Sequence, residues 1–146
     1  MNIMLIKANQ ALYASKGVLN EALFQMSCNI LGEHHQIQVT DTATGLWDVN
    51  DEIHKLKRAD AIVYHFPLWW FGLPHLLKKY LDEVLVYDKT YRLADVYGEG
   101  GQLTGKSFMI AVTTSATTPV RFWQASNRSV PIRLKFKGDR LCSWST

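Results

Sequence analysis

The sequence of 146 residues has little of what most metal and disulfide sites require. Its two cysteines, Cys28 and Cys142, lie far apart and belong to no CxxC or Cys/His pattern. Isolated cysteines are typical of free thiols in a reducing compartment, so we expect a cytoplasmic protein without a disulfide framework. The five histidines have no metal-ligand spacing, and we therefore expect no bound metal.

Long apolar runs are also missing. No stretch of about 18 apolar residues occurs, so no transmembrane helix or stable membrane insertion is expected. Residues 1–7 lack a basic leader and a cleavage site, and they are predicted to form a strand rather than a signal peptide. The absence of a GxSxG motif argues against a hydrolase of the nucleophile-elbow type.

The net charge of +3 is unevenly distributed. Residues 1–116 carry ten basic and twelve acidic side chains, whereas residues 117–146 carry six basic and one acidic. The basic character therefore belongs to the last segment, where aromatic residues among the basic ones raise the alternative of nucleic-acid contact. No recognised nucleic-acid-binding module surrounds this segment, so a solvated basic tail is the favoured interpretation and no nucleic-acid partner is expected.

Hydrophobic periodicity predicts strands that alternate with helices. Apolar, β-rich runs predict strands over 2–7, 37–39, 60–66 and 106–112. Apolar residues at three- and four-residue steps predict helices at 18–30, near 53–57 and from Pro74 to 85. In the first helix, the expected buried face consists of Val18, Leu19, Ala22, Leu23, Met26 and Ile30. This order predicts a single α/β domain with a parallel sheet and helices on both faces.

Three unusual loops follow strands of this predicted sheet: 8–17, 67–74 and 113–116. Right-handed crossovers place them on one rim, where open α/β sheets bind ligands. The middle loop holds Trp69, Trp70 and Phe71 in a frame of prolines and a glycine, which suits a flat conjugated ligand such as a flavin. Burial of the two tryptophans in the core is the alternative. Nearby, His65 is expected to be a hydrogen-bonded histidine at the strand end.

Four blocks carry a resemblance to a known family: S-K-G-V-L-N at 15–20, P-L-W-W-F-G-L-P at 67–74 with L-K-K-Y-L-D-E-V at 77–84, Y-G-E-G-G at 97–101, and T-T-S-A at 113–116. Over residues 1–116 the chain resembles the flavodoxin-fold NAD(P)H dehydrogenase (quinone) family, with the modulator of drug activity B branch as the most similar. The resemblance implies a flavodoxin-like, three-layer, doubly wound parallel sheet. After about residue 116 the sequence does not follow the family, so a shortened or atypical C-terminal part is expected.

The resemblance also implies an activity. It predicts two-electron hydride transfer from NAD(P)H through bound FAD, with FMN as the alternative, to a quinone, in a homodimer. No catalytic side chain is predicted, because the flavin carries the chemistry. The implied cofactor-binding residues are Ser15, Lys16, Gly17, Val18, Leu19, Asn20, Ala22, Leu68, Trp69, Trp70, Phe71, Tyr97, Thr113, Thr114, Ser115 and Ala116.

Three other interpretations share the fold. In the first, the chain is a non-enzymatic flavin-binding regulatory subunit, similar to the ancillary proteins of potassium-efflux systems. In the second, it is a truncated relative without activity. A one-electron flavodoxin carrier is less consistent with the sequence, because such carriers are usually acidic and bind FMN through a Ser/Thr-rich first loop. Since one fold serves all these roles, the fold does not choose among them.

Overall fold

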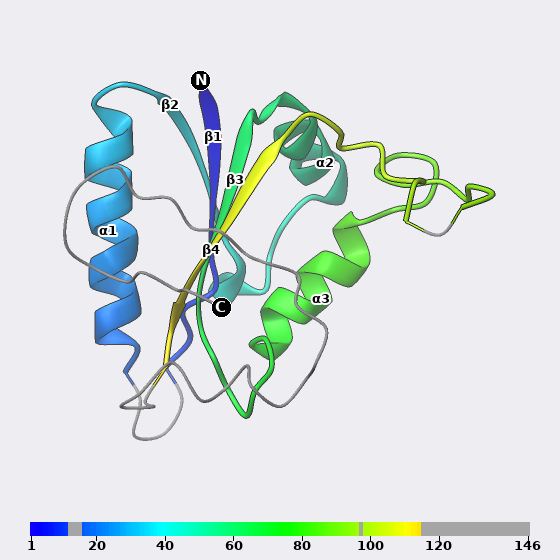
Figure 1. Cartoon of the computed structure of the whole chain (residues 1–146). Helices are drawn as coiled ribbons and strands as arrows, with labels where there is room; N and C mark the ends of the chain where they lie inside the picture. Colours follow the sequence, from blue (N-terminus) through cyan, green and yellow to red (C-terminus); the bar gives the residue numbers. More distant parts are fainter. Residues whose placement is uncertain (12–15, 97, 115–146) are drawn as a thin grey trace, which may run out of the picture. The chain divides into compact units, whose positions relative to one another are not determined.

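A computed structural model describes residues 1–11, 16–96 and 98–114 (Figure 1). The elements in chain order are β1 (Asn2–Lys7), α1 (Val18–Gly32), β2 (Gln36–Asp41), a 3-10 turn η1 (Thr42–Thr44), α2 (Val49–Arg58), β3 (Ala61–Pro67), α3 (His75–Val84) and β4 (Ser107–Thr113). The alternation predicted from the periodicity is therefore present, and each expected strand lies within one or two residues of its predicted place. The segment 117–146, where the sequence does not follow the family, lies outside the described residues.

The four strands form one parallel sheet in the order β2-β1-β3-β4. β1 lies inside the sheet, and its residues Met4, Leu5 and Ile6 are fully buried. Leu5 is aligned with Val39 on β2 and with Val63 on β3. Because β1 is buried on both faces, its sequence is a continuous apolar run rather than an alternating one.

Helices cover both faces of the sheet (Figure 1). One face packs against α2 and α3 through Met4, Ile6, Leu56, Ile62, Phe66, Leu77 and Tyr80. The other face packs against α1 through Ile3, Leu5, Phe24 and Val63. Successive residues of a strand point to opposite faces, which is why neighbours such as Met4 and Leu5 enter different cores. The sheet with a helix layer on each side is the three-layer α/β architecture that the sequence predicted.

The buried face of α1 differs from the prediction. Asn20 and Phe24 are buried against the sheet, whereas the six residues expected to be buried, Val18, Leu19, Ala22, Leu23, Met26 and Ile30, are exposed. Both sets recur at helical spacing, and Glu21 is the helix's one charged residue. A helix that is apolar over most of its circumference has no single stripe that periodicity can select. The packing partner therefore decided which stripe was buried.

Candidate functional site

Three segments meet at the carboxyl ends of β1, β3 and β4. The amide of Ala8 donates to the carbonyl of His65 at 2.8 Å, and the amide of Leu68 donates to the carbonyl of Thr113 at 2.8 Å. The side-chain amide of Asn20, in the first turn of α1, donates to the Thr113 hydroxyl at 3.4 Å. The rim that the strand order predicted is therefore present in the described part of the chain.

The start of α1 has a left-handed glycine and no side-chain cap. This residue, Gly17, precedes the helix with a φ of 64°. A Cβ atom at this position would lie 1.8 Å from Oδ1 of Asn9 and would displace that side chain, and the left-handed φ itself favours glycine. The first amides of a helix have no partner within it, and the helix dipole adds positive potential there. Such an end binds phosphate groups in many proteins.

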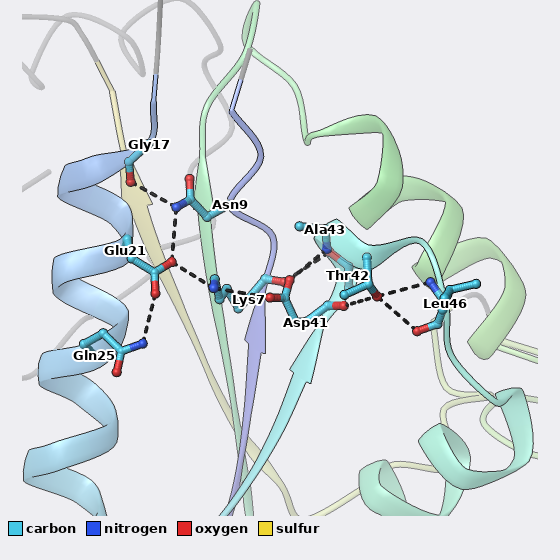
Figure 2. A network of polar contacts seen from close by, with 10 residues as sticks. Lys7, Asn9, Gly17, Glu21, Gln25, Asp41, Thr42, Ala43 and Leu46 are labelled. Carbon is cyan, nitrogen blue, oxygen red and sulfur yellow. Dashed lines mark hydrogen bonds and ion pairs between the residues drawn. The ribbon is translucent and has the colours of Figure 1, made fainter.

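A network of polar contacts holds this turn in place, as Figure 2 shows. The Asn9 side-chain amide donates to the Gly17 carbonyl at 3.0 Å and to the Glu21 carboxylate at 3.3 Å. Glu21 also accepts from Gln25 at 2.9 Å and forms a 2.9 Å ion pair with Lys7. The hydrogen bond from Gln25, followed by that from Lys7, lowers the pKa of Glu21 to about 2, so the carboxylate remains charged.

Two buried polar side chains beside this turn lack hydrogen-bond partners. Asn20 and His65 are each 1% exposed. In the described region, Oδ1 of Asn20 and both ring nitrogens of His65 accept or donate no hydrogen bond. The expectation of a hydrogen-bonded His65 is therefore wrong. Its ring instead packs edge-on against Phe24, 5.5 Å between centroids, and burial lowers the pKa of His65 below its ordinary value.

The loop between β3 and α3 presents two aromatic rings in a strained backbone. Trp69 and Gly72 exchange two backbone hydrogen bonds, of 3.1 and 2.8 Å, and thereby close a tight turn. The two residues between them, Trp70 and Phe71, have positive φ angles of 46° and 66°. Trp70 is 96% exposed and Phe71 is 72% exposed. Core burial therefore does not explain Trp70, and backbone strain of this kind is concentrated at ligand-binding sites.

The predicted cofactor-binding residues fall into three groups in the structure. Lys16 to Asn20, with Ala22, surround the start of α1; Leu68 to Phe71 form the β3–α3 turn; and Thr113 and Thr114 follow β4. The contacts of Thr113 join Asn20 and Leu68, one residue from each of the other two groups. Ala22 lies on the exposed side of α1. Ser15, Tyr97, Ser115 and Ala116 lie outside the described residues.

Two further residues of the rim, Lys7 and Glu21, were not predicted from the sequence, whereas Asn9 lies in the predicted loop 8–17 and His65 was expected beside it. The available signal was position, because Lys7 and His65 stand at the carboxyl ends of β1 and β3. In residues 1–11, 16–96 and 98–114 there is no group of three or more metal-ligating side chains. No helix in these same ranges is long and apolar enough to cross a membrane.

Comparison with known proteins agrees with this architecture. A family model described as "Flavodoxin-like fold" matches residues 1–129. NADPH:quinone oxidoreductase MdaB from Haemophilus influenzae is 35% identical over 127 residues, which cover 80% of this chain and 66% of that protein. Human ribosyldihydronicotinamide dehydrogenase [quinone] is 37% identical over 70 residues, covering 48% of this chain and 30% of that protein.

Solved structures give the same result for the fold. A putative quinone reductase from Klebsiella pneumoniae superposes with a TM-score of 0.62 at 24% identity, covering 78% of this chain and 59% of that one. Smu.1420 from Streptococcus mutans superposes with a TM-score of 0.65 at 24% identity, covering 77% and 67%. The matched region is thus no more than about two thirds of the length of these relatives. The match over residues 1–129, together with the parallel sheet, means that the chain belongs to the flavodoxin-like fold family.

Proposed function

We propose that this chain is a flavin-dependent NAD(P)H:quinone oxidoreductase. The observation that carries the proposal is the exposed, strained pair Trp70 and Phe71 at a rim that also contains the start of α1. Exposed aromatic rings on the same rim as a helix start suit a ligand that combines an aromatic ring system with a phosphate. The relatives named as quinone oxidoreductases and quinone dehydrogenases support the same reaction class.

The residues at the rim are compatible with a bound flavin. The turn at Gly17 offers backbone amides to a phosphate group, and the rings of Trp70 and Phe71 offer apolar faces to an isoalloxazine. The unpartnered Oδ1 of Asn20 is an acceptor for a hydroxyl donor, such as those of the ribityl chain. The remaining predicted residues, Ser15, Lys16, Val18, Leu19, Ala22, Leu68, Trp69, Tyr97, Thr113, Thr114, Ser115 and Ala116, stay part of this proposal.

A bound flavin supplies the acceptance of a hydride from NAD(P)H and its donation to a quinone. The chain's own residues have supporting roles. Trp70 and Phe71 bind the ring and exclude water from it, and the turn at Gly17 fixes the phosphate and thereby the ring's orientation. We propose FAD as the flavin, with FMN as the alternative. An FMN complex is among the related structures, that of general stress protein 14 from Treponema denticola.

The test is a spectroscopic titration of the purified full chain. FAD and FMN are added separately, the visible spectrum is recorded, and NADPH followed by a small quinone is then introduced without oxygen. A bound flavin that NADPH bleaches and quinone re-oxidises supports the proposal. A bound flavin without turnover supports a regulatory subunit instead, and failure to bind either flavin overturns the flavin site itself.

A specific observation favours keeping the regulatory alternative in this test. The matched region spans 66% of MdaB, so part of the relatives' length has no counterpart in the alignment. Flavin binding and quinone turnover are therefore separate expectations, and the titration reads them separately.

We also propose that the chain forms a homodimer, as the family resemblance implies. The exposed apolar face of α1, formed by Val18, Leu19, Leu23, Met26 and Ile30, supports the presence of a partner surface. Light scattering coupled to gel filtration tests this proposal. A single mass near 16.7 kDa at micromolar concentration contradicts it.

A further inference from the structure

Lys7 is the centre of a partly buried cluster of charges at the carboxyl end of β1. Its side chain is 18% exposed, and its ammonium lies 2.9 Å from Glu21 on α1 and 3.2 Å from Asp41 on β2. The same ammonium lies 5.6 Å from the centre of the Phe24 ring. Partial burial alone lowers the pKa of Lys7, but the bonds to Glu21 and Asp41 outweigh this effect and raise it. Lys7 is therefore cationic at neutral pH.

Glu21 occupies a place where the helix dipole favours a negative charge but a bound phosphate does not. It lies in the first turn of α1, next to the turn at Gly17 to which the proposed function assigns the flavin phosphate. A carboxylate near a bound phosphate weakens its binding by repulsion. Glu21 nevertheless accepts a hydrogen bond from Asn9, whose side chain also holds the Gly17 carbonyl. Glu21 thus helps to shape the turn, but its negative charge opposes the binding of a phosphate there.

Resting on the proposed function, we propose that Lys7 is a positioning residue that neutralises Glu21, so that the turn at Gly17 accepts a phosphate group. Lys7 does this from inside the sheet, through Glu21 and Asp41, and not as a phosphate ligand. Figure 2 shows its ammonium placed between these two carboxylates. Because both carboxylates already pair with it, the ammonium compensates their negative charge within the protein. Removal of the lysine leaves two negative charges where the cluster had a net charge of −1.

The test compares flavins with and without a phosphate group. FMN and FAD carry phosphate, whereas riboflavin has the same ring and ribityl chain without it. Binding of each to the full chain is followed by quenching of flavin fluorescence, for the wild type, Lys7→Met, Glu21→Gln and the double variant Lys7→Met/Glu21→Gln. Lys78→Met is the matched control, because it leaves Asp82 on α3 unpaired without changing the cluster of Lys7, Glu21 and Asp41. Circular dichroism and melting curves establish that each variant is folded.

The expected pattern is specific to charge. Lys7→Met weakens FMN and FAD binding roughly five- to tenfold and leaves riboflavin binding within about twofold, and the deficit shrinks as salt is raised. The double variant restores FMN and FAD binding to within about twofold of the wild type, and Lys78→Met has no effect.

Two results overturn the inference while the proposed function stands. If the double variant binds FMN and FAD as weakly as Lys7→Met does while its riboflavin binding is unchanged, Lys7 contacts the phosphate directly. If Lys7→Met weakens riboflavin binding as much as it weakens FMN binding, the role of Lys7 is structural and unrelated to phosphate charge. If the wild type binds none of the three flavins, the proposed function fails, and the inference fails with it.

Discussion

The phenol of Tyr80 on α3 donates a 2.8 Å hydrogen bond to the carboxylate of Glu52 on α2, and both side chains are buried. Glu52 also accepts from Thr40 on β2 at 2.7 Å and from Lys55 at 2.6 Å. Burial, with the neighbouring carboxylate as a second cause, raises the pKa of Tyr80 far above its ordinary value. Three donors thus satisfy one buried carboxylate and tie the two helices to the sheet that positions the rim.

Tyr80→Phe removes one donor from this carboxylate and preserves the ring that packs 5.4 Å from Trp47. We expect the free energy of unfolding to fall by about 1.5–3 kcal/mol, because a hydrogen bond to a buried charged group is lost. Urea denaturation followed by circular dichroism measures the change. Tyr87→Phe, at an exposed tyrosine, is the control, and equal effects of the two substitutions contradict the prediction.

The orientation of α1 is tested by one substitution on each of its faces. Phe24→Ala creates a cavity against the sheet and is expected to lower the free energy of unfolding by about 3 kcal/mol or more. Ile30→Ala, on the exposed face, is expected to change it by no more than about 0.5 kcal/mol when both variants are measured at concentrations where the chain is monomeric. Denaturant titration of both variants gives the comparison. The reverse ranking supports the face first predicted from the periodicity.

Trp70→Asn separates stability from ligand binding. The indole is 96% exposed and its backbone has a positive φ, which Asn tolerates better than Trp. We therefore expect the free energy of unfolding to stay within about 1 kcal/mol of the wild type, or to rise. The flavin dissociation constant is expected to increase about tenfold or more, a change of roughly 1.4 kcal/mol.

Fluorescence quenching measures this binding, and Phe108→Ser serves as a control at an exposed aromatic near the opposite end of β4. Flavin affinity that is unchanged in Trp70→Asn removes the indole from the proposed site. A large loss of stability in the same variant shows that the ring has a packing role.

His65 predicts a dependence of stability on pH. Burial lowers the pKa of His65 in the folded state below its ordinary value of 6.5, so the unfolded chain takes up a proton at a higher pH than the folded one. Stability is therefore unaffected well above pH 6.5 and decreases as the pH falls through and below that value. Unfolding free energies measured from pH 7.5 to 5.5 are expected to decline less steeply in His65→Gln. An unchanged slope in that variant assigns the pH dependence to other groups.

Local sequence patterns were sufficient for the order of elements and for the rim. Apolar runs such as residues 2–7 predict buried parallel strands, and the crossover rule then places the loops after β1, β3 and β4 at one edge. The frame of prolines and a glycine around Trp70 indicated an irregular turn there. These features depend on residues close together in the chain and on the chirality of the backbone, and the structure agrees with them.

The sequence by itself determined the parallel α/β architecture and the three segments of the rim, because hydrophobic period and strand handedness are local properties. Only the tertiary structure decided which face of α1 is buried, that His65 lacks hydrogen-bond partners, and that Lys7 lies between Glu21 and Asp41. The reason is the same in each case. Burial and ion pairing depend on partners 14 to 41 residues away in the chain, and no periodic pattern within one element records which partner will be adjacent.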